Sequence, residues 1–153
     1  MLTQLYAYYD DYEKKLLKLY EKVSPLAGVL GMGNHPKDDP CNTVFYENVE
    51  NWVKEFLAGS PSQEAVEEVA EWILKLAKMH REEKTYWICY ALQGNAKGMI
   101  PMMSQTKAQE LYQWYEEAYP AKEWLPVQEE IYKALKKQSG KSVTKKRGLF
   151  RRG

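Results

Sequence analysis

Residues 60–77 read SPSQEAVEEVAEWILKLA, and this stretch predicts an amphipathic helix with a well-marked beginning. Ser60 is a favoured N-cap residue, Pro61 suits the first helical turn, and Gln63 stands where a capping box needs it. The apolar residues that follow recur at spacings of three and four, which places them on one face of the helix. These residues are Val66, Val69, Ala70, Ile73, Leu76 and Ala77.

The same helical period occurs twice before this stretch. An apolar stripe near the N-terminus predicts a helix that ends before Pro25. A second helix is expected to begin at a cap formed by Asn42 or Thr43 and to end at Gly59. The stripe of the first helix consists of Leu5, Tyr9, Tyr12, Leu16, Leu19 and Val23.

Three further helices are predicted after residue 77. They cover residues 85–93, 104–119 and 126–139, with an irregular connection over 94–103. Residues 85–93 are apolar nearly all round, so this helix is expected to be deeply buried. The sequence shows neither strand alternation nor an internal repeat. The pattern therefore predicts an all-α fold, a compact bundle of five or six helices.

The charges divide the chain into an acidic body and a basic tail. All 21 acidic residues lie at or before Glu130, while residues 136–153 hold eight of the 22 basic residues and no acidic one. The first 135 residues therefore carry a net charge of −7, although the whole chain has a formal charge of +1. The length and this asymmetry predict one helical domain over residues 1–138 and a flexible basic tail over 139–153.

The sequence carries no signal that directs the chain to a membrane or to an oxidising compartment. The N-terminal residues lack the basic and apolar regions of a signal peptide, and the longest apolar run, Tyr86–Leu92, is too short for a span. Two cysteines do not make a disulfide framework. We therefore expect a cytoplasmic protein with reduced thiols.

The long connection after the first helix contains GVLGMGNHPKDDPCN, residues 28–42. One interpretation is a metal- or ligand-binding loop that uses His35, Cys41 and nearby aspartates, since loops of this length are often functional. The other is a connector whose leading apolar residues pack on the bundle. Its glycines match no phosphate-binding motif, so the sequence favours the connector and leaves the binding loop as an alternative.

Metal and catalytic signatures are weak throughout the chain. The two histidines and two cysteines could together hold a zinc ion, but their spacing fits no familiar ligand pattern. Neither histidine follows a glutamate by three residues, as di-metal helical bundles require, and nucleophile motifs are missing. The sequence therefore predicts no cofactor and no metal, and it favours a non-enzymatic protein. The alternative metal ligands are His35, Cys41, His80 and Cys89.

Aromatic residues are more numerous than one small core needs. The chain has 12 tyrosines and five tryptophans, and several of them fall outside the apolar stripe of their helix. Tyr and Trp combine a large apolar area with a polar group, and clusters of them on a surface mark protein-binding sites. We predict a partner-binding surface formed by Tyr6, Tyr8, Trp72, Trp114 and Trp124.

The C-terminal segment reads KKQSGKSVTKKRGLFRRG from Lys136 to Gly153. Blocks of like charge at a terminus are often interaction segments, and Leu149 and Phe150 would add an apolar contact between the basic clusters. A solvated terminus without a partner is equally compatible with this composition. The residues expected to contact nucleic acid or an acidic partner are Lys141, Lys145, Lys146, Arg147, Arg151 and Arg152.

These features favour a non-enzymatic helical interaction protein, either an adaptor or an inhibitor. Its acidic, aromatic-rich surface would bind a protein partner, for example in a complex that handles nucleic acid. A second hypothesis is a nucleic-acid-binding accessory protein that is anchored by its basic tail. A third is a metal- or small-molecule-binding helical protein that uses residues 28–42.

Overall fold

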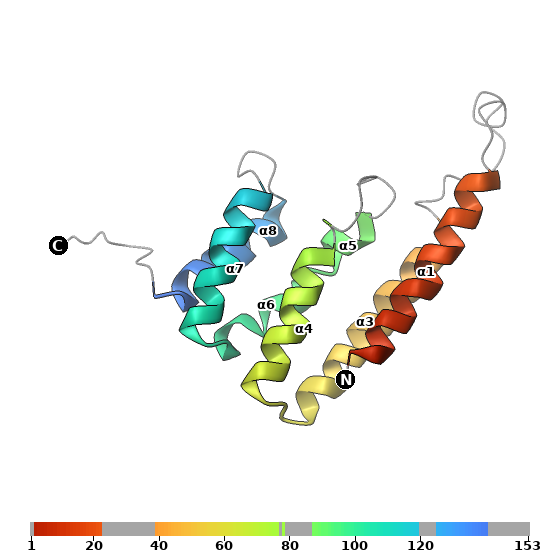
Figure 1. The fold of residues 1–153 in the computed structure, drawn as a ribbon. Coiled ribbons are helices and arrows are strands. Elements are labelled where there is room, and N and C mark those ends of the chain that lie inside the picture. The colour runs from red at the N-terminus through yellow and green to blue at the C-terminus, as the bar shows by residue number, and fades with distance from the viewer. Residues whose placement is uncertain (1, 23–38, 77, 79–86, 120–124, 141–153) are drawn as a thin grey trace.

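The computed structural model describes residues 2–22, 39–76, 78, 87–119 and 125–140 (Figure 1). Every regular element within these ranges is a helix, which confirms the predicted all-α fold. The elements are α1 (Thr3–Lys22), α3 (Pro40–Ala58), α4 (Gln63–Leu76), α5 (Trp87–Ala91), α6 (Gly94–Lys97), the 3-10 helix η3 (Ile100–Met102), α7 (Gln105–Ala118) and α8 (Pro126–Gln138). None of these described helices is long and apolar enough to span a lipid bilayer.

Two antiparallel helix pairs stand on either side of α4 (Figure 1). The α1 helix packs on α3 at one end of the molecule, and α7 packs on α8 at the other. The short elements connect the two pairs, because α5 contacts α3 and α4 while α6 and η3 contact α4 and α8. The helix predicted over 85–93 is represented by α5, whose Ile88 and Cys89 are buried as expected.

The α1 and α3 helices are joined by stacked rings and a buried hydrogen bond. Tyr12 of α1 lies on Phe45 of α3 with ring centroids 4.4 Å apart and an interplanar angle of 5°. The Tyr12 hydroxyl donates to Oδ1 of Asn42, 2.6 Å away. This contact ties the beginning of α3 to the middle of α1, and a buried amide in such a place is stabilising only when it is hydrogen-bonded.

The α3 helix begins earlier than its sequence predicted. Asp39 is the N-cap, since its Oδ2 accepts a hydrogen bond of 2.9 Å from the backbone N–H two residues later. Pro40 suits the first turn because it has no N–H that would be left unsatisfied. The prediction that Asn42 or Thr43 caps this helix is wrong, because Asn42 lies inside the helix and its side chain holds Tyr12.

The α4 helix begins two residues later than predicted. Ser62 provides the helix-start contact, because its Oγ accepts a hydrogen bond of 3.2 Å from the N–H of Ala65. Ser60 instead belongs to the turn between α3 and α4, where it adopts a φ of 51°. The predicted capping box between Ser60 and Gln63 is therefore wrong, and Gln63 Nε2 donates to the carbonyl oxygen of Met102 over 3.3 Å.

Residues 94–103 form short helices, although an irregular connection was predicted there. Gly98 is the C-cap of α6, and Pro101 lies in the first turn of η3, a position that tolerates proline. Met99 and Ile100 are fully shielded from solvent, and the two short helices pack against α4 and α8. The stretch therefore contributes to the core rather than only joining two helices.

The α7 and α8 helices begin and end close to their predicted positions. Ser104 is the N-cap of α7, since its Oγ accepts a backbone hydrogen bond of 3.1 Å from the first turn. Pro126 opens α8, as predicted. Ser139 follows α8 and is buried, and its carbonyl oxygen accepts hydrogen bonds of 3.1 Å from the side chains of Gln105 and Gln109 on α7.

A buried polar cluster holds α7 against α4. Gln93 is completely buried, its Oε1 accepts from the Tyr115 hydroxyl over 2.6 Å, and its Nε2 donates to the Tyr119 oxygen over 3.0 Å. The Tyr119 hydroxyl donates to the carbonyl oxygen of Leu74 over 3.1 Å. Burial raises the pKa of the Tyr115 hydroxyl, which therefore remains a donor. Buried polar groups are costly when unsatisfied, so this cluster favours one arrangement of the helices.

Candidate protein-binding surface

Two of the predicted partner-binding residues meet where α1 passes α4. The ring centroids of Tyr6 and Trp72 are 6.0 Å apart, and the ring of Tyr9 meets Trp72 edge-on at 6.5 Å. Tyr6 is 47% exposed, whereas Trp72 is half-buried against the core. The Trp72 indole therefore fills this junction and leaves part of its surface, together with Tyr6, accessible to a partner.

A third predicted residue, Trp114 of α7, also contacts α4. Its half-buried indole packs edge-on against Tyr119, with ring centroids 5.8 Å apart at an interplanar angle of 84°. Lys75 of α4 places its Nζ 5.2 Å from the centre of the Trp114 indole. A cation above an aromatic ring is attracted by about 0.5–1 kcal/mol at partly exposed sites. Lys75 thus connects the α4 helix to Trp114.

The solvent side of α4 links these aromatic residues. Glu64, Glu68 and Trp72 follow one another at spacings of four, and Lys75 follows three residues later, which places them on one side of the helix. Glu64 and Glu68 are exposed, and neither forms an ion pair within the described ranges. We call this surface the α4 face; it consists of Tyr6, Glu64, Glu68, Trp72, Lys75 and Trp114.

Next to this surface, Glu71 forms ion pairs that join α4 to α7. Its two oxygens lie 2.7 Å from Nζ of Lys75 and 2.7 Å from Nζ of Lys107. Burial acts to raise the pKa of Glu71, but hydrogen bonds from Lys107 and Lys75 outweigh burial and hold the pKa below its ordinary value. The hydrogen bond to Glu71 raises the pKa of Lys107. Because Glu71 balances Lys75, the unpaired glutamates leave the α4 face acidic.

These ion pairs predict a pH-dependent difference between the wild type and Glu71→Gln. Because its pKa is lowered, Glu71 stabilises the fold at pH values above its ordinary pKa of 4.5. This stabilisation is lost as the pH falls through the pKa of Glu71 in the folded state. At neutral pH we expect Glu71→Gln to lower the free energy of unfolding by about 0.5–1 kcal/mol. Urea unfolding at a series of pH values should show the two proteins converging in acid.

A matched control for this experiment is Glu68→Gln, which removes an exposed carboxylate from the same helix. Its free energy of unfolding at neutral pH should stay within about 0.5 kcal/mol of the wild type. A Glu71→Gln difference that persisted unchanged in strong acid would contradict the role given to these ion pairs.

The remaining predicted partner-binding residues are Tyr8 and Trp124. Tyr8 follows Tyr6 by two residues, so it lies about 200° around α1, and it is half-buried. Trp124 lies outside the described residues, as do the basic residues of the tail within 141–153. The tail contacts that were predicted for nucleic acid or an acidic partner therefore remain predictions from the sequence.

Two of the alternative metal ligands lie in described helices. Cys41 is buried in the first turn of α3, and Cys89 is buried in α5, while His35 and His80 lie outside the described residues. Among the described residues, no group of three His, Cys, Asp or Glu side chains could hold a metal ion. The α3 helix also takes up the end of the predicted loop 28–42.

Both thiols are expected to react slowly in the folded protein. Burial, followed by the hydrogen bond and charge of Asp39, raises the pKa of Cys41 to about 12, and burial alone raises the pKa of Cys89. Because the thiolate is the reactive form, a disulfide reagent at pH near 8 should modify both residues slowly in buffer and rapidly in denaturant. Rapid stoichiometric labelling of Cys41 in buffer would show that the first turn of α3 opens readily.

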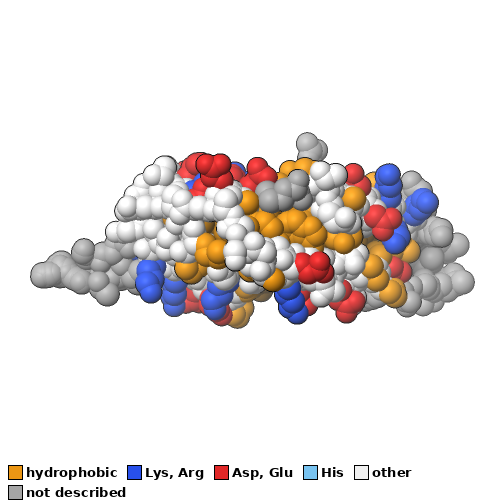
Figure 2. Space-filling view, turned by 90° about the horizontal axis from the view of Figure 1, so that it is seen from below, with side chains coloured by type: hydrophobic (Ala, Val, Ile, Leu, Met, Phe, Trp, Pro, Cys, Tyr) orange, Lys and Arg blue, Asp and Glu red, His pale blue; other side chains and the backbone are white. Residues whose placement is uncertain are grey.

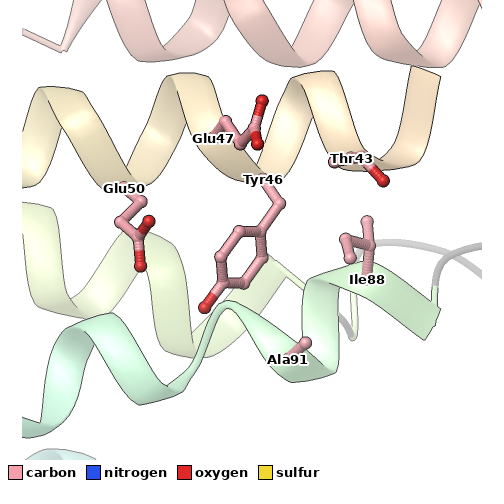
Figure 3. A pocket seen from close by; sticks show the side chains of 6 residues that line it. All are labelled: Thr43, Tyr46, Glu47, Glu50, Ile88 and Ala91. Atoms are coloured by element: carbon pink, nitrogen blue, oxygen red, sulfur yellow. The ribbon is translucent and has the colours of Figure 1, made fainter. Parts of the chain in front are cut away.

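A groove between α3 and α5 is a second candidate binding feature, with a volume of about 380 Å³ (Figure 3). No motif in the sequence points to it, because its two walls come from helices that are distant in the chain. The spacing of Tyr46 and Glu50 by four residues does place them on one side of α3, but only the contact with α5 makes that side concave. The lining residues are Thr43, Tyr46, Glu47, Glu50, Ile88 and Ala91.

Apolar surface is not confined to these two places. Figure 2 shows hydrophobic side chains gathered along the middle of the underside, with charged side chains of both signs around them. Leu17 and Leu125 are 54% and 51% exposed, respectively. Singly exposed apolar residues such as Leu17 and Leu125 are common on proteins and carry little information. The α4 face differs because aromatic rings and unpaired carboxylates occur together on it.

Comparisons with protein-family models, with curated proteins and with solved structures found no match to this chain. A function must therefore be inferred from the described residues themselves. The α4 face and the groove between α3 and α5 are the two features on which such an inference can be built, because each combines apolar contacts with unpaired charge.

Proposed function

We propose that this chain is a non-enzymatic interaction protein that acts in the cytoplasm, as an adaptor or an inhibitor, by binding a basic protein partner. The proposal rests on one observation. Tyr6 and Trp72 are in contact at an accessible junction, and the unpaired carboxylates of Glu64 and Glu68 lie along the same side of α4 as Trp72. Aromatic anchors beside unpaired charge are a combination that protein partners recognise.

The rigidity of the aromatic residues supports this proposal. The Trp72 indole is held by Tyr9 on one side and packs against the buried core. A ring that is already fixed loses little conformational freedom when a partner binds, so more of the contact energy becomes affinity. The acidic side chains then favour a partner with a basic surface, because opposite charges accelerate encounter and oppose mismatched partners.

Affinity capture with two variants of the full chain would test the proposal. Tyr6→Ala combined with Glu68→Lys removes the accessible ring and reverses one charge on the α4 face. The control, Leu17→Ala combined with Glu55→Lys, makes a similar truncation and the same charge change at exposed positions outside it. We expect a partner that is captured by the wild type and by the control to be lost from the α4-face variant.

The captured proteins would be identified and quantified by mass spectrometry. Isotope-labelled extracts allow the amount of each protein captured by a variant to be compared with the amount captured by the wild type in one experiment. Circular dichroism would first establish that both variants fold. If every captured protein bound the α4-face variant and the control equally well, the α4 face would not be the binding surface.

A further inference from the structure

The groove between α3 and α5 combines apolar contacts with an acidic edge (Figure 3). Tyr46 points its ring from α3 toward α5, and Ile88 and Ala91 face the ring from α5. Glu50 lies beside the ring, and Glu47 projects from the same stretch of α3. A ligand in this groove would therefore meet apolar side chains and two carboxylates at once.

The polar groups at this groove have no other partners within the described residues. Neither the Glu47 nor the Glu50 carboxylate forms an ion pair or a hydrogen bond there, and the Tyr46 hydroxyl has no hydrogen-bond partner there. In contrast, Glu71 and Glu130 are each paired with lysine. The groove thus presents two uncompensated negative charges, which favour a cationic ligand.

A segment of the chain itself has the matching chemistry. Residues 145–152 read KKRGLFRR, so that Leu149 and Phe150 stand between two basic clusters. The two apolar side chains suit the floor of the groove, and the flanking basic residues suit the carboxylates of Glu47 and Glu50. The charge of −7 on the first 135 residues adds a long-range attraction for this segment.

We propose that the groove between α3 and α5 binds residues 145–152 of a second copy of this chain. The described chain ends just after α8, where the carbonyl oxygen of Ser139 is held by Gln105 and Gln109 of α7. Figure 1 places the α7–α8 pair at one end of the molecule and α3 at the other. The described chain therefore ends on the other side of α4 from the groove, which favours binding between molecules over binding within one.

Binding of this kind joins molecules head to tail, because the tail and the groove are different surfaces of the same chain. Further copies can add while one tail and one groove stay open at the ends, and the assembly closes into a ring when the last tail fills the first groove. The attraction depends on exposed charges, and it should therefore weaken as the ionic strength rises. The groove shares no residue with the α4 face, so the failure of either proposal leaves the other intact.

Photocrosslinking in the full chain would test this proposal. Phe150 is replaced by the photoreactive residue p-benzoylphenylalanine, and equal amounts of ¹⁵N-labelled and unlabelled chain, purified free of nucleic acid, are mixed and irradiated at low ionic strength. We expect crosslinks that pair a labelled with an unlabelled chain and that map to residues 43–50 or 87–92. Their yield should fall by about tenfold in Glu47→Lys/Glu50→Lys, since two favourable charge contacts become repulsive.

A matched control and a tail variant complete the experiment. Glu55→Lys/Glu117→Lys makes the same change of charge at exposed positions outside the groove, and it should keep the wild-type yield. Because Leu149 lies outside the described helices, Leu149→Ser should lower the crosslink yield without changing them. This variant therefore still tests the proposal if the groove variant fails to fold. Crosslinks only within single chains, crosslinks to other surfaces, no crosslinks, or equal yields in the groove variant and the control would each overturn the proposal.

Discussion

Phe45→Ala is expected to lower the free energy of unfolding by about 3–5 kcal/mol, the usual cost of removing a large core aromatic residue. Phe45 is only 2% exposed, and its ring stacks on Tyr12 of α1. The centroid of the Phe45 ring also lies 6.0 Å from the centroid of the Tyr9 ring. The substitution would leave a cavity between α1 and α3, where the rings now fill the space. Urea-induced unfolding followed by circular dichroism measures the change.

The neighbouring residue provides a matched control for this prediction. Val44 is 46% exposed on the same helix, so Val44→Ala should change the free energy of unfolding by less than about 0.5 kcal/mol. A similarly small effect of Phe45→Ala would mean that the α1–α3 pair is not held together by this ring stack. Hydrogen exchange in α1 would then be expected to remain unaltered.

Ile73→Ala is the second substitution with a large expected effect, about 2–5 kcal/mol. Ile73 is completely buried on α4, the helix that stands between the two helix pairs. A cavity there should weaken packing on both sides, so hydrogen exchange should accelerate in α1 and α3 as well as in α7 and α8. Guanidinium unfolding measures the loss of stability, and hydrogen exchange shows whether it is shared.

Glu68→Ala on the same helix is the control for Ile73→Ala. The Glu68 side chain is exposed, so the change should cost less than about 0.5 kcal/mol. If Ile73→Ala accelerated exchange only in α7 and α8, the α1–α3 pair would be a unit whose stability does not depend on α4.

The helices could be located from the sequence because their apolar stripes are long and regular. In α4, for example, Val66 and Ile73 are both on the predicted stripe and both completely buried. A stripe of this kind reports burial directly, since the period of the residues equals the period of the helix. The fold class followed from these stripes together with the lack of strand alternation.

The exact helix beginnings could not be read in the same way. Several residues near each beginning can cap a helix, and the choice depends on contacts elsewhere in the molecule. Ser60 is used by the turn after α3, so Ser62 provides the cap-like contact, and Asn42 is used by Tyr12, so Asp39 caps α3. Local residue preference does not distinguish between such neighbours.

The candidate surfaces were accessible to sequence reasoning only in part. Tyr6 and Trp72 could be selected because they fall outside their stripes, but their contact depends on how α1 passes α4. The groove between α3 and α5, and the buried cluster around Gln93, required the arrangement of helices that are distant in the chain. A polar residue inside a core has no periodic signature, because its partners come from other elements.

The pairing of successive long helices has a consequence for how quickly the chain reaches its folded state. Each pair, α1 with α3 and α7 with α8, joins helices that are neighbours in the element order. Helical proteins dominated by such nearby contacts fold in microseconds to milliseconds, because little chain entropy is lost before contacts form.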